Sequence, residues 1–214
     1  MEDTSNKRGM LNKLVNIITG KPDNHPTQEK NKDLQGIHAP TEKDPLDVAF
    51  VKNFTRSGGK FLYCEDSKEA YHYLGEIASE AGIHKVVCPN GDLNSIFQRA
   101  GLDSGESGHL EVDAFASPCE FLVSFNGGIM LTARQTQGRK LSELPATFIT
   151  FAYTSQITES LRSALAGIRQ RYHGDIPSQI TTIKGPRKVS EIEDDQPGQI
   201  CNKEIYLLLL EDQQ

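Results

Sequence analysis

Residues 60–101 alternate short apolar segments with amphipathic ones, and this rhythm limits the possible folds more than any other feature. The segments "KFLYC" (60–64) and "KVVCP" (85–89) have the length and composition of buried strands. Each is followed by a helical pattern, at 66–81 and 93–101, and each pattern ends at a glycine. Successive strand–helix units imply parallel strands joined by crossover helices. The sequence therefore predicts an α/β fold.

The pattern changes in the second half of the chain. "CEFLVSFNGGIMLTAR" (119–134) contains two apolar runs separated by Asn126-Gly127-Gly128, which predicts a β-hairpin. A long helix, capped by Thr154 or Ser155, is expected after the next strand. The strand is expected at 146–152 and the helix at 157–172. The last two strands are expected at 178–183 and 204–212. We expect a three-layer sandwich with a mixed, mostly parallel sheet.

The first 45 residues differ from the rest. Residues 1–19 contain an amphipathic helical pattern at 6–19. Its apolar face would suit either a partner protein or the chain's own folded part. Residues 20–45 are polar, with few apolar side chains to offset the entropy of ordering, which predicts a flexible linker. We expect the folded α/β domain to span 46–212.

Charge, hydropathy and cysteine spacing exclude several classes of function. The net charge of −6 argues against a general nucleic-acid-binding protein. No apolar run approaches the roughly 18–20 residues of a membrane-spanning helix, and the N-terminus does not resemble a signal peptide. The four cysteines form no CxxC and no Cys/His cluster, so we expect no metal or iron–sulfur cluster in this chain and a reducing cytoplasm around it.

The first candidate site is the segment that follows the predicted strand 178–183. Gly185-Pro186 would make a rigid turn, and the following residues carry two cations and then several acids. Ligands of α/β sheets bind beyond the carboxyl ends of strands, so this loop would accept a carboxylate or phosphate. The alternative is a plain turn with solvated charges. The candidate residues are Gly185, Pro186, Arg187, Lys188, Glu191 and Glu193.

The second candidate site is the hairpin. Glu120 lies within an apolar segment and would need a partner if it were buried. Asn126, Gly127 and Gly128 form the tip, where glycines would let the backbone approach a ligand closely. The alternative is an ordinary hairpin with Glu120 in solvent. Cys88, at a strand end, fits a buried inert thiol better than a nucleophile.

Taken together, four blocks resemble the LUD domain of the lactate utilization protein C family. They are an acidic hairpin, a strand after a Leu-Pro pair, a Gly-Pro loop that ends in an acidic-Ile-Glu triplet, and an aliphatic last strand. Here they read "CEFLVSFNGGIML", "LSELPATFITFA", "IKGPRKVSEIE" and "EIYLLLLED". The resemblance covers about residues 46–212. It implies a fold similar to the ribose-5-phosphate isomerase and CoA-transferase type.

The resemblance also implies a function. In bacteria the family is associated with a cytoplasmic complex that oxidises L-lactate to pyruvate, in which partner subunits carry the iron–sulfur clusters. This chain would then be an accessory subunit without a cofactor of its own. A stand-alone binding protein or enzyme for a small carboxylated or phosphorylated metabolite is the alternative. The sequence leaves open whether this chain catalyses a reaction.

Site residues follow from the resemblance by position. Glu120 matches the acidic residue of the hairpin, and Gly127 or Gly128 its glycine. The Gly-Pro loop corresponds to Gly185, Pro186, Lys188, Glu191 and Glu193. Two positions depart from the family. Lys188 stands where the family usually has arginine, and Ile200-Cys201-Asn202 stands where it tends to have His-Gly-Pro.

Overall fold

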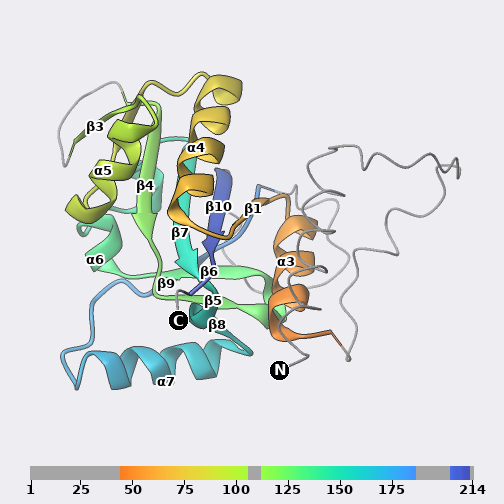
Figure 1. Cartoon of the computed structure of the whole chain (residues 1–214). Coiled ribbons are helices and arrows are strands. Elements are labelled where there is room, and N and C mark those ends of the chain that lie inside the picture. The colour runs from red at the N-terminus through yellow and green to blue at the C-terminus, as the bar shows by residue number, and fades with distance from the viewer. Residues whose placement is uncertain (1–43, 106–111, 187–202, 213–214) are drawn as a thin grey trace, which may run out of the picture.

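A computed structural model describes residues 44–105, 112–186 and 203–212 of the 214-residue chain (Figure 1). Its centre is a six-stranded sheet in which every neighbouring pair of strands is parallel. The α/β prediction is therefore confirmed. In spatial order the strands are β1 (Lys60–Cys64), β10 (Glu204–Leu210), β7 (Thr147–Tyr153), β4 (Ala114–Pro118), β2 (Lys85–Val87) and β3 (Asp103–Gly105).

The predicted hairpin forms, but it belongs to a second and smaller sheet. β5 (Phe121–Val123) and β6 (Gly128–Leu131) are antiparallel, with Leu122 opposite Ile129. β8 (Ile157–Thr158) lies parallel to β5, and β9 (Thr181–Ile183) lies antiparallel to β6. The antiparallel pairs thus lie in this sheet, whereas the six-stranded sheet is wholly parallel.

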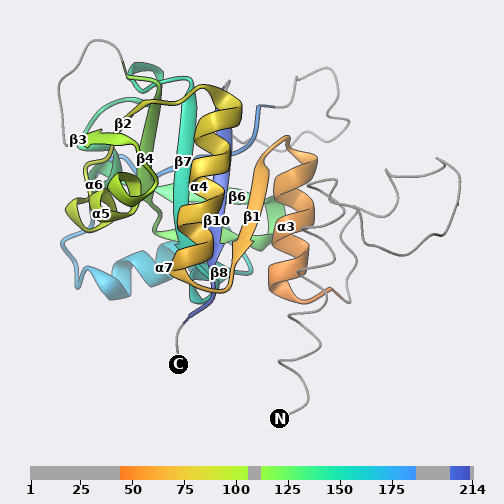
Figure 2. The ribbon, with the colours of Figure 1, turned by 45° about the horizontal axis from the view of Figure 1, so that its top comes forward.

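The parallel sheet is covered on both faces (Figure 2). α4 (Ser67–Ala81) and α5 (Gly91–Arg99) cover one face. α3 (Leu46–Arg56) and the small sheet cover the other, where Phe50, Phe54 and Leu122 join its core. α7 (Leu161–Arg171) packs on the far face of the small sheet, below it in Figure 1. The short helical turns are α6 (Ala133–Thr136), η1 (Ser124–Asn126), η2 (Leu141–Glu143) and η3 (Thr154–Gln156).

Local sequence signals account for the first helices. The Asp66 carboxylate accepts hydrogen bonds from the amides of Lys68 and Glu69 and so caps α4, which ends at Gly82 in the left-handed conformation. α3 begins at Leu46, as its apolar spacing predicts, and the Asn90 side chain caps α5.

The start of α7 was predicted wrongly. The helix is capped by Ser160, rather than by Thr154 or Ser155, and it begins at Leu161. Ile157 and Thr158 instead pair with Leu122 and Val123 as β8. An available strand edge on β5 thus outcompetes the extra helical turn that the apolar spacing suggested.

Candidate functional site

The carboxyl ends of β4, β7 and β10 meet at one edge of the parallel sheet. β4 leads directly into Cys119 and Glu120, which begin the hairpin segment. Glu120 is only 1% exposed, although it is a carboxylate. Burying an unpaired charge is very costly, so the partners of Glu120 determine what this site can do.

Donors from two other segments fill both oxygens of the Glu120 carboxylate. Its Oε1 accepts hydrogen bonds from the hydroxyl of Tyr172 at 2.6 Å and from Nε2 of Gln135 at 2.8 Å. Its Oε2 pairs with Nη1 of Arg171 at 2.6 Å. These hydrogen bonds and the ion pair with Arg171 compensate for the cost of burying the Glu120 side chain.

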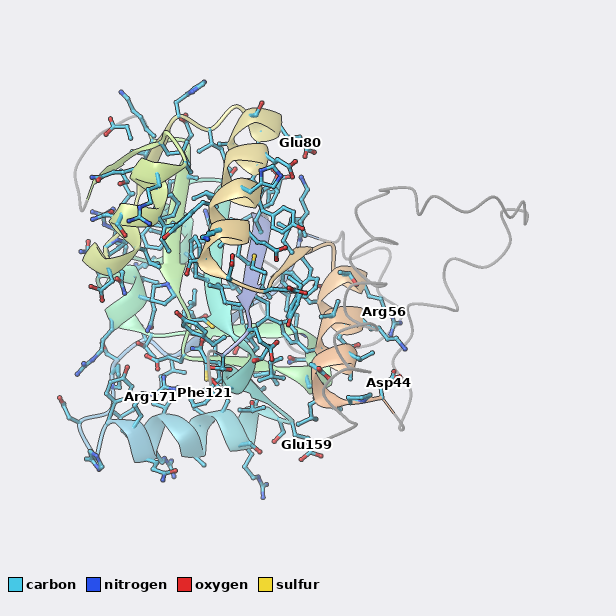
Figure 3. The ribbon with its side chains drawn as sticks, in the orientation of Figure 1. Asp44, Arg56, Glu80, Phe121, Glu159 and Arg171 are labelled. Atoms are coloured by element: carbon cyan, nitrogen blue, oxygen red, sulfur yellow. The ribbon has the colours of Figure 1, made fainter. Side chains whose placement is uncertain are left out.

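The same side chains support one another by stacking. The Arg171 guanidinium lies 4.7 Å from the centre of the Phe121 ring, and both side chains are labelled in Figure 3. The Arg134 guanidinium lies 4.5 Å from the centre of the Tyr172 ring. Two cations from separate elements therefore flank the pair formed by Tyr172 and Glu120.

The surroundings keep the Tyr172 phenol protonated. Burial raises the pKa of Tyr172, and its hydrogen bond to Glu120 raises the pKa further. Tyr172 is therefore a hydrogen-bond donor at neutral pH. Glu120, with both oxygens occupied, is not placed to act as a base. Its effect is to fix the orientation of Arg171, whose side chain is 44% exposed and reaches solvent.

Backbone contacts complete this cluster. The Gln156 side chain donates to the carbonyl oxygens of Cys119 at 2.7 Å and Glu120 at 3.2 Å. Beside it, the Asp212 carboxylate accepts hydrogen bonds from Thr154 and Ser155 and ties the end of β10 to the end of β7. The carboxyl edge of the sheet is thus held by hydrogen bonds in the part of the chain described here.

The glycines of the hairpin tip approach the chain itself. A Cβ on Gly127, whose φ is +64°, would lie 2.3 Å from the amide nitrogen of Phe54 in α3. A Cβ on Gly128 would lie 2.4 Å from Cγ2 of Thr182. The Asn126 side chain accepts a hydrogen bond from the Gly128 amide and shapes the turn. These contacts give the tip a packing role against α3 and β9. Its ligand-binding role stays a prediction.

Gly185 also lies against α3 and at the opposite edge from Glu120. Its amide donates to the Ser57 hydroxyl at 3.2 Å, and a Cβ there would lie 2.3 Å from the amide nitrogen of Gly59. Gly59 precedes β1, so Gly185 sits at an amino end of the parallel sheet. The expectation that this loop follows a strand of that sheet was wrong, because β9 belongs to the small sheet.

The rest of the Gly-Pro loop is only partly described. Pro186 is exposed, whereas Arg187, Lys188, Glu191 and Glu193 lie outside the described residues, as do residues 200–202. Lys184, just before the loop, is half-buried, and its burial lowers its pKa. The hairpin tip contacts α3, and Gly185 contacts the residues just after its carboxyl end. Glu120 belongs to a separate cluster.

The sequence did not indicate the partners of Glu120. Arg171 and Tyr172 lie at the end of a helix some 50 positions away, where a cation and an aromatic residue are common. The one usable signal was Glu120 itself, since a carboxylate in an apolar segment requires donors from elsewhere. The described cysteines are buried, and burial raises the pKa of Cys64 to about 12 and that of Cys88 to about 11. This fits the inert-thiol interpretation of Cys88.

The described residues contain no group of three or more His, Cys, Asp or Glu side chains placed to hold a metal ion. None of their helices has both the length and the apolar character needed to cross a membrane.

The fold and edge cluster define an α/β protein in which a parallel sheet carries a small hairpin sheet and a helix beyond it. Residues 105–210 match the LUD domain family. The chain is 29% identical over 144 residues to "Lactate utilization protein C" of Geobacillus thermodenitrificans, a match that covers 64% of this chain and 55% of that protein. These matches confirm the predicted resemblance to the LUD domain family over residues 105–210.

A solved structure shares the fold. A DUF162 family protein from Deinococcus radiodurans superposes with a TM-score of 0.55 at 18% identity. The superposition covers 78% of this chain and 96% of that structure. At this identity the likeness shows the fold alone.

Proposed function

We propose that this chain is an accessory subunit that supports the oxidation of L-lactate to pyruvate in the cytoplasm, together with iron–sulfur partner subunits. The observation that carries the proposal is the match to lactate utilization protein C. The LUD domain match over residues 105–210 supports it, because that range includes the hairpin, β7 and the last strand. The match spans just over half of that relative, so the activity and the partners are part of the proposal.

The proposed division of labour follows from the cysteines. Cys64 and Cys88 lie in the core beneath α4 and α5, Cys119 lies in the core on the other face of the sheet, and burial raises the pKa of each thiol. Cluster ligation requires thiolates that converge on one site. We therefore place the electron-carrying clusters in the partners, and we expect the isolated chain to purify anaerobically without stoichiometric iron or zinc.

The test is genetic and biochemical. Deleting the gene should abolish growth on L-lactate and leave growth on pyruvate unchanged, and a plasmid copy should restore it. A tagged copy should co-purify with iron–sulfur proteins, and that preparation should reduce a dye when lactate is added. Normal growth of the deletion strain on lactate would overturn the proposal.

A second candidate is the binding of a small carboxylated or phosphorylated metabolite. Arg171 favours it, because its orientation is fixed by a buried carboxylate while nearly half of its side chain remains in solvent. An arginine ordered in this way loses little entropy on binding a second anion. The neighbouring Arg134 stacks on Tyr172 and forms an exposed pair with Asp175 at 3.8 Å, and it would turn toward the same anion.

Two sets of variants separate this site from the Gly-Pro loop. Arg171→Lys keeps the charge beside Glu120 but loses the planar fork, and Arg169→Lys on the same helix is its control. Lys188→Ala tests the loop, with Arg187→Ala as control. Lactate, pyruvate and a sugar phosphate are titrated against each. We expect the responsible variant to lose about tenfold to a hundredfold in affinity, which corresponds to one charge-assisted hydrogen bond. If all four variants bind like wild type, neither location is the site.

A further inference from the structure

Four large apolar side chains are exposed on three elements that meet at one corner of the molecule. Leu46 is 48% exposed, Phe125 63%, Leu161 39% and Leu165 40%. They come from the start of α3, from η1 and from the first turns of α7. We call these four residues the corner patch. Clustered exposed apolar residues of this size commonly mark an interaction site.

Backbone contacts bring the three elements together. The Ser124 hydroxyl donates to the carbonyl oxygen of Leu46 at 2.8 Å, which joins η1 to the start of α3. The Phe125 amide donates to the carbonyl oxygen of Glu159 at 3.0 Å, just before α7 begins. Figure 3 shows Asp44 and Glu159 at this corner, at the base of α3 and at the start of α7.

Phe125 is presented rigidly. The Asn53 side chain donates to the carbonyl oxygens of Ser124 at 2.8 Å and Phe125 at 3.2 Å. With the bond to Glu159, the backbone of Phe125 is held from two sides while its ring points to solvent. An ordered aromatic ring loses little entropy when a partner covers it, which is how anchors of interfaces behave.

A segment of the same chain has the matching character. Residues 6–19 place Met10, Leu11, Leu14, Val15 and Ile18 on one helical face. A helix of this length is marginal alone in water and needs an apolar partner. The segment also carries three cations and no acid. The acidic residues Asp47 and Glu159 flank the patch, and Arg162 offsets part of their negative charge.

The linker between residues 6–19 and the folded part keeps this segment close to the corner patch. Residues 20–43 join the segment to Asp44, two positions before Leu46 of the patch. A polar chain of this length spans about 25–30 Å on average, so the segment reaches the corner patch without strain. Such a tether gives an effective concentration of about 1 mM, above that of a free partner protein.

We propose that residues 6–19 dock as an amphipathic helix on the corner patch of their own chain, with Phe125 as the anchor. This goes beyond the proposed metabolic role and does not depend on it. The docked segment covers the start of α3 and of α7, so a partner that uses this corner must first displace it.

The test is hydrogen exchange of backbone amides in the full-length chain. In wild type we expect residues 6–19 to exchange about tenfold or more slowly than an unprotected peptide. That slowing corresponds to a docking constant of about 0.1 mM at the tether's effective concentration. Phe125→Ser and Leu14→Asp should each remove the protection. Leu14→Asp leaves the folded domain untouched, so it stays informative if the other variant unfolds.

Matched controls exclude general effects. Ile176→Ser changes an apolar residue that is 44% exposed, beyond the other end of α7, and should leave the protection intact. Asn12→Asp adds the same charge as Leu14→Asp, but on the polar face of the segment, and should likewise leave the protection intact. No protection in wild type, protection that survives Phe125→Ser, or protection that rises with protein concentration would each overturn the proposal. The last outcome would assign the patch to a second copy.

Discussion

Glu120 shows how one buried carboxylate can organise a corner of a protein. Four side chains converge on it, Thr132 and Gln135 from the start of α6 and Arg171 and Tyr172 from the end of α7, and each uses a charged or polar donor. The pair with Arg171 links the hairpin to α7, which otherwise packs mainly through a small apolar cluster. The stability of this corner therefore depends on a single charge.

Glu120→Gln should destabilise the protein. The amide keeps the size of the side chain but cannot accept from all four donors, and the charge beside Arg171 is lost. We expect the free energy of unfolding to fall by about 1.5–3 kcal/mol, measured from urea midpoints. Glu80→Gln, at the exposed residue labelled in Figure 3, should change it by less than about 0.5 kcal/mol. Equal effects of the two changes would contradict the role given to Glu120.

Asp212 should contribute to the pH dependence of stability. Burial alone would raise its pKa, but hydrogen bonds from Thr154 and Ser155 outweigh burial and hold the pKa below its usual value. A carboxyl whose folded-state pKa is depressed stabilises the fold above its unfolded pKa of about 3.9. That contribution is lost as the pH falls through the folded-state pKa.

Asp212→Asn should therefore lose less stability than wild type between pH 5 and about 2, because the amide does not titrate. Urea unfolding across this pH range measures the difference, and the exposed Asp92→Asn serves as control. Parallel stability curves for wild type and Asp212→Asn would show that the carboxylate makes no such contribution.

At the scale of elements, α3 is the support of the hairpin tip and of Gly185. Gly127 and Gly185 both bring their backbones against it, one near Phe54 and the other at its carboxyl end. The Asn-Gly signal of the turn thus serves two purposes. It allows the left-handed backbone of the turn, and it leaves room for a helix 70 positions earlier in the chain.

Gly127→Ala should destabilise the fold, because its φ of +64° disfavours a side chain and the added Cβ would meet α3 backbone at 2.3 Å. We expect a loss of more than about 1 kcal/mol. Gly75→Ala, inside α4 with nothing within 4 Å, should instead stabilise by about 0.5–1 kcal/mol. Thermal melts of both variants test the contrast in sign. A stable Gly127→Ala protein would show that the tip can move away from α3.

For the whole molecule, the described part forms one core on each face of the parallel sheet. Aromatic residues of α3 fill one core, and apolar residues of α4 and α5 fill the other. The fold therefore requires α3 and the last strand together, since β10 lies between β1 and β7 in the sheet and carries residues of both cores. The buried core residues run from Val48 to Leu210, so a truncation that enters this range removes core side chains.

Limited proteolysis should follow the predicted domain boundaries. The polar composition of residues 20–45 makes them the expected site of first cleavage. The product that begins near Leu46 should persist, and mass spectrometry of early fragments identifies the cuts. First cleavage within residues 60–90, which hold β1, α4 and β2, would refute the boundary.

Sequence alone determined the elements whose signals are local. The strand "KFLYC", the helix end at Gly82 and the Asn126-Gly127 turn each occupy a few adjacent residues, and each was predicted where the structure has it. β3 and β4 were not predicted, because "DSG" is polar and "AFASP" is short and ends in proline. β3 pairs with β2, and β4 pairs with β2 and β7, so their strand conformation is stabilised by these neighbours, not by their own composition.

Only the tertiary structure decided which segments meet. The separation of the hairpin into its own sheet, the placement of Gly185 against α3, and the pairing of Glu120 with Arg171 all join residues far apart in the chain. The physical reason is that periodicity and capping act within a few residues, whereas the partner of a buried charge is chosen by packing. A carboxylate in an apolar segment indicates that hydrogen-bond donors are needed, and only the folded chain determines which side chains supply them.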